Sequence, residues 1–103
     1  MKNLYIALSF AVGTLTVTAQ NKETKVADKL FGRYEYVDAA KEYLKLVEKG
    51  KSDGYVYKQL ADSYFNVFNT AEAAKWYAKA VETNQDSETY YRYAQMLKAN
   101  GKY

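Results

Sequence analysis

The chain has 103 residues, which is enough for one small domain. Its 15 Lys and Arg residues against 12 Asp and Glu residues give a net charge of +3, too small to indicate a nucleic-acid surface. The absence of cysteine and histidine from the sequence excludes disulfides, thiolate chemistry and imidazole ligands for zinc. The hydrophobic share of 49%, which includes 12 tyrosines, is sufficient for a folded core.

The segment 1–19 has the parts of a secretory signal peptide. Lys2 supplies a positive charge, residues 4–17 form an apolar run, and residues 17–19 are small enough for a cleavage site. A membrane span needs about 20 apolar residues, and the polar sequence from Gln20 ends this run early. We therefore predict cleavage after Ala19, which leaves an exported chain that begins at Gln20 and has no transmembrane span.

Two amphipathic helices are predicted in the first half of this exported chain. The first runs from Lys22 to Leu30 and ends near Gly32, and the second ends at Gly50, a residue type that often follows a helix. Helices joined by so few residues pack as antiparallel neighbours. Their apolar stripes consist of Val26, Ala27 and Leu30 in the first helix and of Ala39, Ala40, Tyr43, Leu44 and Val47 in the second.

A second pair of helices is predicted between residues 54 and 87. A polar residue able to cap a helix stands before each predicted start: Asp53, then Asn69 with Glu72 three residues later, and Asp86 before a fifth helix. The apolar stripes at helical spacing are Tyr57, Leu60, Ala61 and Tyr64, then Ala73, Tyr77 and Ala80. Small residues in these stripes allow the two helix axes to approach closely.

The helical patterns repeat along the chain. Ala39 and Tyr43 recur as Ala73 and Tyr77, at an offset of 73 − 39 = 34. The fifth helix repeats the stripe of the third at an offset of 90 − 57 = 33, with Tyr90, Tyr93, Ala94 and Leu97. The order of large, small and aromatic residues over 54–87 resembles the tetratricopeptide repeat (TPR) family, whose period matches the first offset. Gln85 departs from that pattern, because the family usually has proline there.

The resemblance implies an all-α fold in which TPR helix-turn-helix units form an array after the signal peptide at 1–19. It divides residues 20–103 into repeats at about 20–53 and 54–87 and an incomplete repeat at 88–103. The last helix would then carry an apolar face that nothing in the sequence covers, and such arrays normally end in a polar cap. We expect this face to be covered by a longer chain, a partner or a second copy.

No enzymatic activity, cofactor or metal site is predicted. General acid–base catalysis most often uses histidine, which is absent. The carboxylates of Asp28, Asp38, Asp62 and Glu72 are interpreted as solvated or helix-capping groups, because no pattern marks a pocket around them. An enzyme would be expected only in a carboxy-terminal extension.

The resemblance to the TPR family implies a concave groove lined by the first helix of each repeat, suited to an extended peptide or a partner helix. Aromatic residues there would act as anchors. The positions that fall on this face are Asp28, Phe31, Tyr55, Lys58, Asp62, Phe65, Asn66, Tyr91, Gln95 and Lys98.

One subset of the TPR family clamps a terminal carboxylate with lysines, an arginine and asparagines. Lys58 and Arg92 resemble fragments of that clamp, but Asp62 and Asp28 occupy slots where asparagine is expected. A receptor for cytosolic chaperone tails is therefore not predicted, and export argues against it as well.

A signal peptide followed by tyrosine-rich repeats resembles the front end of Bacteroidota envelope proteins, in which such repeats precede a β-propeller and an OmpA-like domain. This resemblance implies a periplasmic scaffold, associated with the outer membrane, that binds envelope proteins. The alternative is a glycan-binding helical repeat protein of the starch-utilisation type, in which Tyr55 and Tyr91 would stack on sugars. That type is typically a lipoprotein, and this signal ends without a cysteine.

Overall fold

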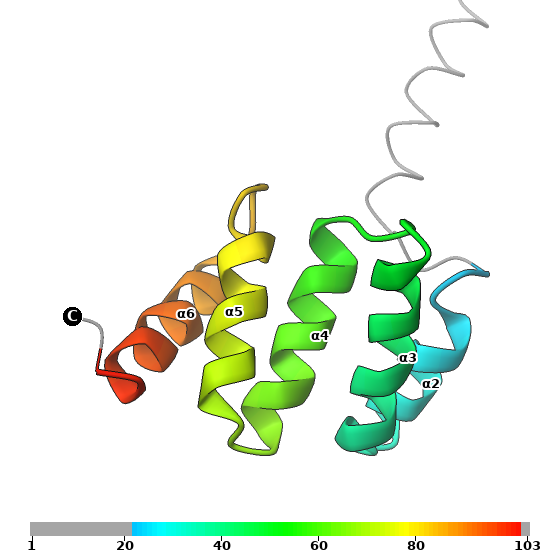
Figure 1. The fold of residues 1–103 in the computed structure, drawn as a ribbon, viewed down its shortest axis with the longest axis horizontal. Helices are drawn as coiled ribbons and strands as arrows, with labels where there is room; N and C mark the ends of the chain where they lie inside the picture. The colour runs from blue at the N-terminus through cyan, green and yellow to red at the C-terminus, as the bar shows by residue number, and fades with distance from the viewer. Residues whose placement is uncertain (1–21, 102–103) are drawn as a thin grey trace, which may run out of the picture.

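The computed structural model describes residues 22–101, and this part of the chain is all helical, with no β-strand (Figure 1). The predicted signal peptide at 1–19 lies outside the described residues, as do residues 102–103. The predicted all-α fold is confirmed for the part that the structure describes. The helices are α2 (Lys25–Gly32), α3 (Tyr36–Glu48), α4 (Gly54–Asn66), α5 (Thr70–Ala80) and α6 (Ser87–Ala99).

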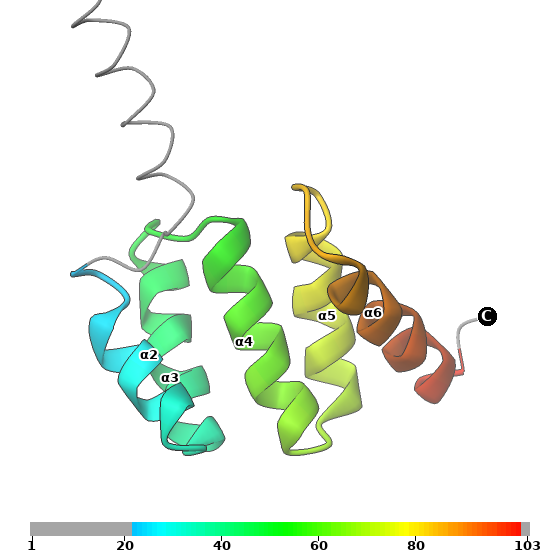
Figure 2. The same cartoon turned by 180° about the vertical axis from the view of Figure 1, so that it is seen from behind.

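The helices form antiparallel pairs that follow one another in a row. Three-residue turns, at 33–35 and 67–69, join α2 to α3 and α4 to α5. Figure 1 shows the row from α2 at one end to α6 at the other, and the reverse view in Figure 2 places α2 and α6 in front of α3 and α5. The last helix, α6, therefore packs on α5 and has no described helix on its other side.

The pairs are repeats of one another in structure as well as in sequence. The first residues of α3 and α5 differ in number by 70 − 36 = 34, and those of α4 and α6 differ by 87 − 54 = 33. The one-residue slip predicted for the last repeat is therefore present. It arises between the starts of α5 and α6, because α5 has 11 residues where α3 has 13, while the connection after α5 is one residue longer. Two residues of the first and second pairs are called equivalent when their numbers differ by 34. Two residues of α4 and α6 are called equivalent when their numbers differ by 33.

Side-chain caps fix where three of the helices begin. Asp53 and Asp86 each accept a hydrogen bond from the backbone N–H three residues on, at 3.0 and 2.9 Å. Asn69 does the same at 3.2 Å. Glu72 does not complete a capping box, because its carboxylate accepts from Trp76 Nε1 at 3.1 Å instead. These caps satisfy backbone donors that the first turn of a helix leaves unpaired, so the predicted starts of α4, α5 and α6 are correct.

Gln85, which departs from the repeat pattern, has a structural role. Its side-chain amide donates to the backbone carbonyls of Gly54 and Ala80, both at 3.1 Å. These bonds hold the connection between α5 and α6 against the start of α4. A Cβ atom on Gly54 would lie only 2.2 Å from Thr83 Oγ1, so this close approach depends on glycine.

The core lies along the seams within and between the helix pairs. Alanines supply much of the buried core, and the stacked rings of Tyr57 and Trp76, 5.9 Å apart, join α4 to α5. The two tyrosines of the second helices, Tyr43 and Tyr77, are completely buried. The buried alanines in these seams are Ala27, Ala39, Ala40, Ala61 and Ala73.

Val26 does not belong to the core, which corrects its predicted place on the apolar face of the first helix. Its side chain is 60% exposed, whereas the equivalent residue of the next pair, Leu60, is 0% exposed. Helix α4 is covered on both sides, by α3 and α5, but α2 lies at the end of the row with no described helix outside it (Figure 1). The same sequence position is therefore buried in one repeat and exposed in the other.

The turns within the two pairs place an aromatic residue in the left-handed backbone region. Tyr34 has φ 65° and Phe68 has φ 62°, while the equivalent residue after α6, Gly101, has φ 76°. The side chains of Tyr34 and Phe68 are 78% and 88% exposed, so burial does not offset the strain of a bulky residue in this conformation.

We expect Phe68→Gly to stabilise the chain by about 0.5–1 kcal/mol, because glycine relieves the strain while losing little buried surface. Urea unfolding followed by circular dichroism measures this change. Val67→Gly is the comparison variant, because Val67 has φ −109° and glycine there relieves no strain. It adds freedom to the unfolded chain and removes a side chain that is 39% exposed. Destabilisation by both variants would contradict the strain argument.

Candidate functional site

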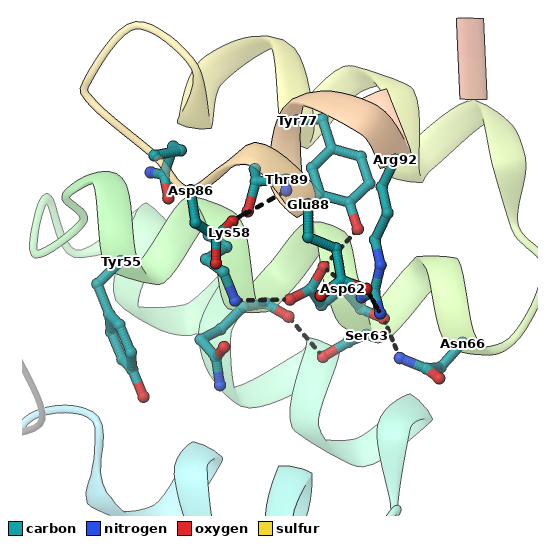
Figure 3. A network of polar contacts seen from close by, with 12 residues as sticks. Tyr55, Lys58, Asp62, Ser63, Asn66, Tyr77, Asp86, Glu88, Thr89 and Arg92 are labelled. Atoms are coloured by element: carbon teal, nitrogen blue, oxygen red, sulfur yellow. Dashed lines mark hydrogen bonds and ion pairs between the residues drawn. The ribbon is translucent and has the colours of Figure 1, made fainter. Parts of the chain in front are cut away.

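A buried carboxylate joins three helices in the second half of the molecule. Asp62 of α4 is 4% exposed, and Figure 3 shows the side chains of Lys58, Tyr77 and Arg92 pointing towards it. Lys58 Nζ lies 2.9 Å from Asp62 Oδ2, Arg92 Nη1 lies 3.1 Å from Oδ1, and the Tyr77 hydroxyl also donates to Oδ1. Asp62 therefore links α4 to α5 and α6 and is neither solvated nor a cap, which corrects the interpretation from sequence.

The groups around Asp62 are engaged with one another. The Arg92 guanidinium lies 4.5 Å from the ring centroid of Phe65 and also binds Glu88 at 3.1 Å. Lys58 and Arg92 both neutralise Asp62, so the two cations that resembled a carboxylate clamp already have a carboxylate partner within the chain. An external carboxylate would have to displace Asp62 to use them.

A similar cluster holds the first half of the molecule together. Asp28 of α2 accepts hydrogen bonds from Tyr43 of α3, from Tyr55 of α4 at 2.8 Å, and from Thr24 at 2.8 Å. Gln59 Nε2 donates to the Tyr43 hydroxyl at 3.1 Å. Tyr55, which the TPR resemblance placed in the groove, thus uses its hydroxyl to tie α4 to α2.

The two clusters are equivalent, and the sequence analysis, which named their residues separately, missed the hydrogen bonds that join them. Asp28 and Asp62 occupy equivalent positions, as do Tyr43 and Tyr77, and the separation between aspartate and tyrosine is 15 in both repeats. Buried polar groups are costly without a partner, so a recurring Asp and Tyr at one fixed spacing was the signal that could have identified these bonds.

Burial raises the pKa of Tyr43 and Tyr77 well above the ordinary value of about 10. The hydrogen bond to Asp28 raises the pKa of Tyr43 further, and the charge of Asp62 does the same for Tyr77. The folded state therefore holds both phenolic protons more tightly than the unfolded state does.

We expect the free energy of unfolding to fall as the pH rises above about 10, by up to about 1.4 kcal/mol per pH unit for each tyrosine. The sign follows because a raised pKa contributes stability that is complete below the unfolded value and is lost above it. Urea unfolding between pH 8 and alkaline pH measures the slope. Tyr77→Phe should reduce it, while Tyr91→Phe, at an exposed position, serves as the control. An equal slope in both variants would contradict the assignment.

The predicted groove residues on α6 are placed differently from those on α2 and α4. Tyr91, Gln95 and Lys98 are exposed, and together with Ala94 and Ala99 they line an open hollow of about 470 Å³. Here the side chains face outwards from the end of the row of helices. This face of α6, defined by these five residues, is called the open α6 face.

The ten predicted groove residues therefore do not all present free side chains. Phe31 packs edge-on against Tyr36, with ring centroids 5.2 Å apart, and Asn66 donates to the backbone carbonyl of Asp62 at 2.8 Å. The side chains of Asp28, Tyr55, Lys58, Asp62 and Phe65 contact other residues in the two clusters. Of the ten residues, the three on α6, Tyr91, Gln95 and Lys98, lie on the open α6 face.

Searches against protein-family models, curated proteins and solved structures found no match to this chain. Within residues 22–101, no helix is both long and apolar enough to cross a bilayer. The same residues contain no group of three or more acidic side chains positioned to hold a metal ion.

Proposed function

We propose that this chain is an exported, non-enzymatic scaffold of tetratricopeptide repeats that binds protein partners in the cell envelope. In this proposal the signal peptide directs the chain out of the cytoplasm, and the repeats form the leading segment of an OmpA-like assembly at the outer membrane. The chain holds partners together and performs no chemistry.

The observation that carries the proposal is the recurrence of one helix pair with the same internal bonds. The second helix of each pair contributes a buried alanine, Ala39 or Ala73, and a buried tyrosine four residues later, Tyr43 or Tyr77. Each tyrosine hydroxyl binds an aspartate on the first helix of its pair. Repeat arrays of this kind present extended surfaces to partners, and the open α6 face offers one here.

The glycan-binding alternative receives less support from the same contacts. It requires Tyr55 and Tyr91 to offer aromatic faces to sugars. Tyr55 is half-buried with its hydroxyl bound to Asp28, so only Tyr91 presents a largely exposed ring.

Site-specific photo-crosslinking tests the scaffold proposal in the cells that make the protein. The photoreactive amino acid benzoylphenylalanine replaces Tyr91 on the open α6 face in one variant and Tyr34, another exposed aromatic at a turn, in the other. We expect defined adducts with envelope proteins from position 91 and few from position 34. Amino-terminal sequencing of the same envelope fraction should begin at Gln20.

Retention of the chain in the cytoplasm with segment 1–19 still attached would contradict export. Binding to a glycan array that is lost in Tyr91→Ala, without protein adducts at either position, would favour the sugar-binding alternative. Equal adducts at positions 34 and 91 would show that the repeats have no specific partner surface at α6.

A further inference from the structure

The open α6 face is the equivalent of two helix faces that are already covered within this chain. Ala94 is equivalent to Ala61, which is 0% exposed beneath α5. Ala61 is in turn equivalent to Ala27, which is buried beneath α3. Ala94 itself is exposed. The internal interfaces α2–α3 and α4–α5 therefore indicate what kind of segment fits on α6.

The helix that covers each equivalent face carries the same two residues. Ala39 lets α3 pack closely on α2, and Ala73 lets α5 pack closely on α4. Four residues later, Tyr43 donates its hydroxyl to Asp28 and Tyr77 donates its hydroxyl to Asp62. The pattern Ala-x-x-x-Tyr thus contributes one steric and one polar contact on the same helical stripe. Both contacts are made twice in this molecule.

The position of the aspartate is occupied on α6 by Gln95, the equivalent of Asp62. A glutamine side chain has a carbonyl oxygen that accepts a hydrogen bond from a tyrosine hydroxyl. Unlike Asp62, which binds Lys58 and Arg92, Gln95 is neutral and needs no cations when it is covered. The open α6 face can therefore bind a helix without a further charged partner for Gln95.

We propose, on the basis of the proposed scaffold function, that the open α6 face binds an α-helix of another protein that carries the pattern Ala-x-x-x-Tyr. The partner alanine packs on Ala94, and the partner tyrosine donates its hydroxyl to Gln95. The interface repeats the α4–α5 seam between two molecules, with Tyr91 and Lys98 at its edge.

The pattern in this chain itself argues for a different protein as the occupant. The sequence contains Ala-x-x-x-Tyr three times. Two copies lie in α3 and α5 and are fully buried in their own pairs. The third begins at Ala99, the last residue of α6, and its tyrosine lies outside the described residues. Within residues 22–101, a second copy of the chain therefore has no free helix of this kind to offer unless it unfolds.

A helical peptide copied from α5 tests the proposal directly. The probe is residues 69–82, labelled with fluorescein and stapled between positions 75 and 79, which lie on the exposed side of α5. Fluorescence anisotropy measures its binding to the full chain. We expect saturable binding that Ala94→Leu weakens by at least about tenfold, and that replacing the peptide tyrosine by phenylalanine weakens by about fivefold.

Matched variants distinguish this mode of binding from nonspecific hydrophobic binding of the peptide. Ala71→Leu changes an exposed alanine of α5 in the same way and should leave the affinity unchanged. Gln95→Ala should weaken binding about fivefold, because it removes the acceptor of the tyrosine hydroxyl. Gln95→Glu should weaken binding as well, because the covered carboxylate would lack cation partners of the kind that Asp62 has in Lys58 and Arg92.

Absence of binding by the stapled peptide, or binding that Ala94→Leu does not weaken, would overturn the proposal. A dimer of the chain alone, detected by light scattering and dissociated by Ala94→Leu, would also overturn it, since a second copy would then cover the face. Neither result removes the scaffold function, which the adducts at position 91 test separately.

Discussion

Asp62→Asn is expected to destabilise the chain by about 2–4 kcal/mol, well above the cost of losing a surface ion pair. The change leaves Lys58 and Arg92 without the charge that neutralises them in the cluster. Removing one partner of a buried ion pair typically costs about 3–5 kcal/mol. The expected value is lower because about a quarter of each cationic side chain remains exposed, at 27% and 25%.

Urea unfolding monitored by circular dichroism gives this loss as a lower midpoint at constant slope. A chain of this size has a free energy of unfolding of about 4–12 kcal/mol, so the midpoint should move substantially. Glu88→Gln is the control, because it removes a 68% exposed carboxylate that also binds Arg92. A surface ion pair of this kind is worth about 0–1 kcal/mol. Equal losses in both variants would show that Asp62 is not the centre of the cluster.

Local features of the fold were predictable from sequence because each depends on few neighbouring residues. Asp53, Asn69 and Asp86 cap helices as predicted, since an N-cap needs only a side-chain oxygen and the backbone three residues on. The offsets between repeats were equally visible, because buried alanines and tyrosines recur at helical spacing. Helix order and pairing followed from these two signals.

The interpretation of Asp62 from sequence failed because its environment is assembled from three helices. A lone aspartate in an amphipathic pattern is normally solvated. Its burial follows only when Tyr77 and Arg92, which are distant from it along the chain, are brought to the same point. The prediction that Val26 lies in the core was wrong for the opposite reason. Its local sequence pattern is apolar, but no described helix covers that side of α2, and its side chain is exposed.

The exposure of the predicted groove residues also depended on contacts that the local sequence does not encode. The TPR resemblance placed Tyr55 and Tyr91 on one kind of surface, since they belong to equivalent helices. Helix α4 has neighbours on both sides and uses Tyr55 to bind Asp28, whereas α6 has a described neighbour on one side only and presents Tyr91 outwards. Whether a residue on a repeated helix is available to a partner thus depends on the place of that helix in the row, which the local sequence does not encode.

Ala73→Leu is expected to destabilise the chain by about 1–3 kcal/mol or more, through overpacking of the α4–α5 seam. Ala73 is 0% exposed and belongs to the core cluster that includes Ala61 and Leu60. A leucine there adds three carbon atoms where two helix backbones approach closely. The helices must then separate. Tyr77 lies four residues after Ala73 in α5, so its hydroxyl is also displaced from Asp62 in α4.

Ala71→Leu provides the matched control, because it makes the same change on the same helix at an exposed position. Alanine and leucine have similar helix propensities, so helix formation alone predicts nearly equal stability for the two variants. A difference of at least about 1 kcal/mol in urea unfolding therefore measures the packing of the seam. If the two variants unfolded at the same urea concentration, α5 would not pack on α4 through Ala73, and the helix pairing on which the α6 proposal rests would be wrong.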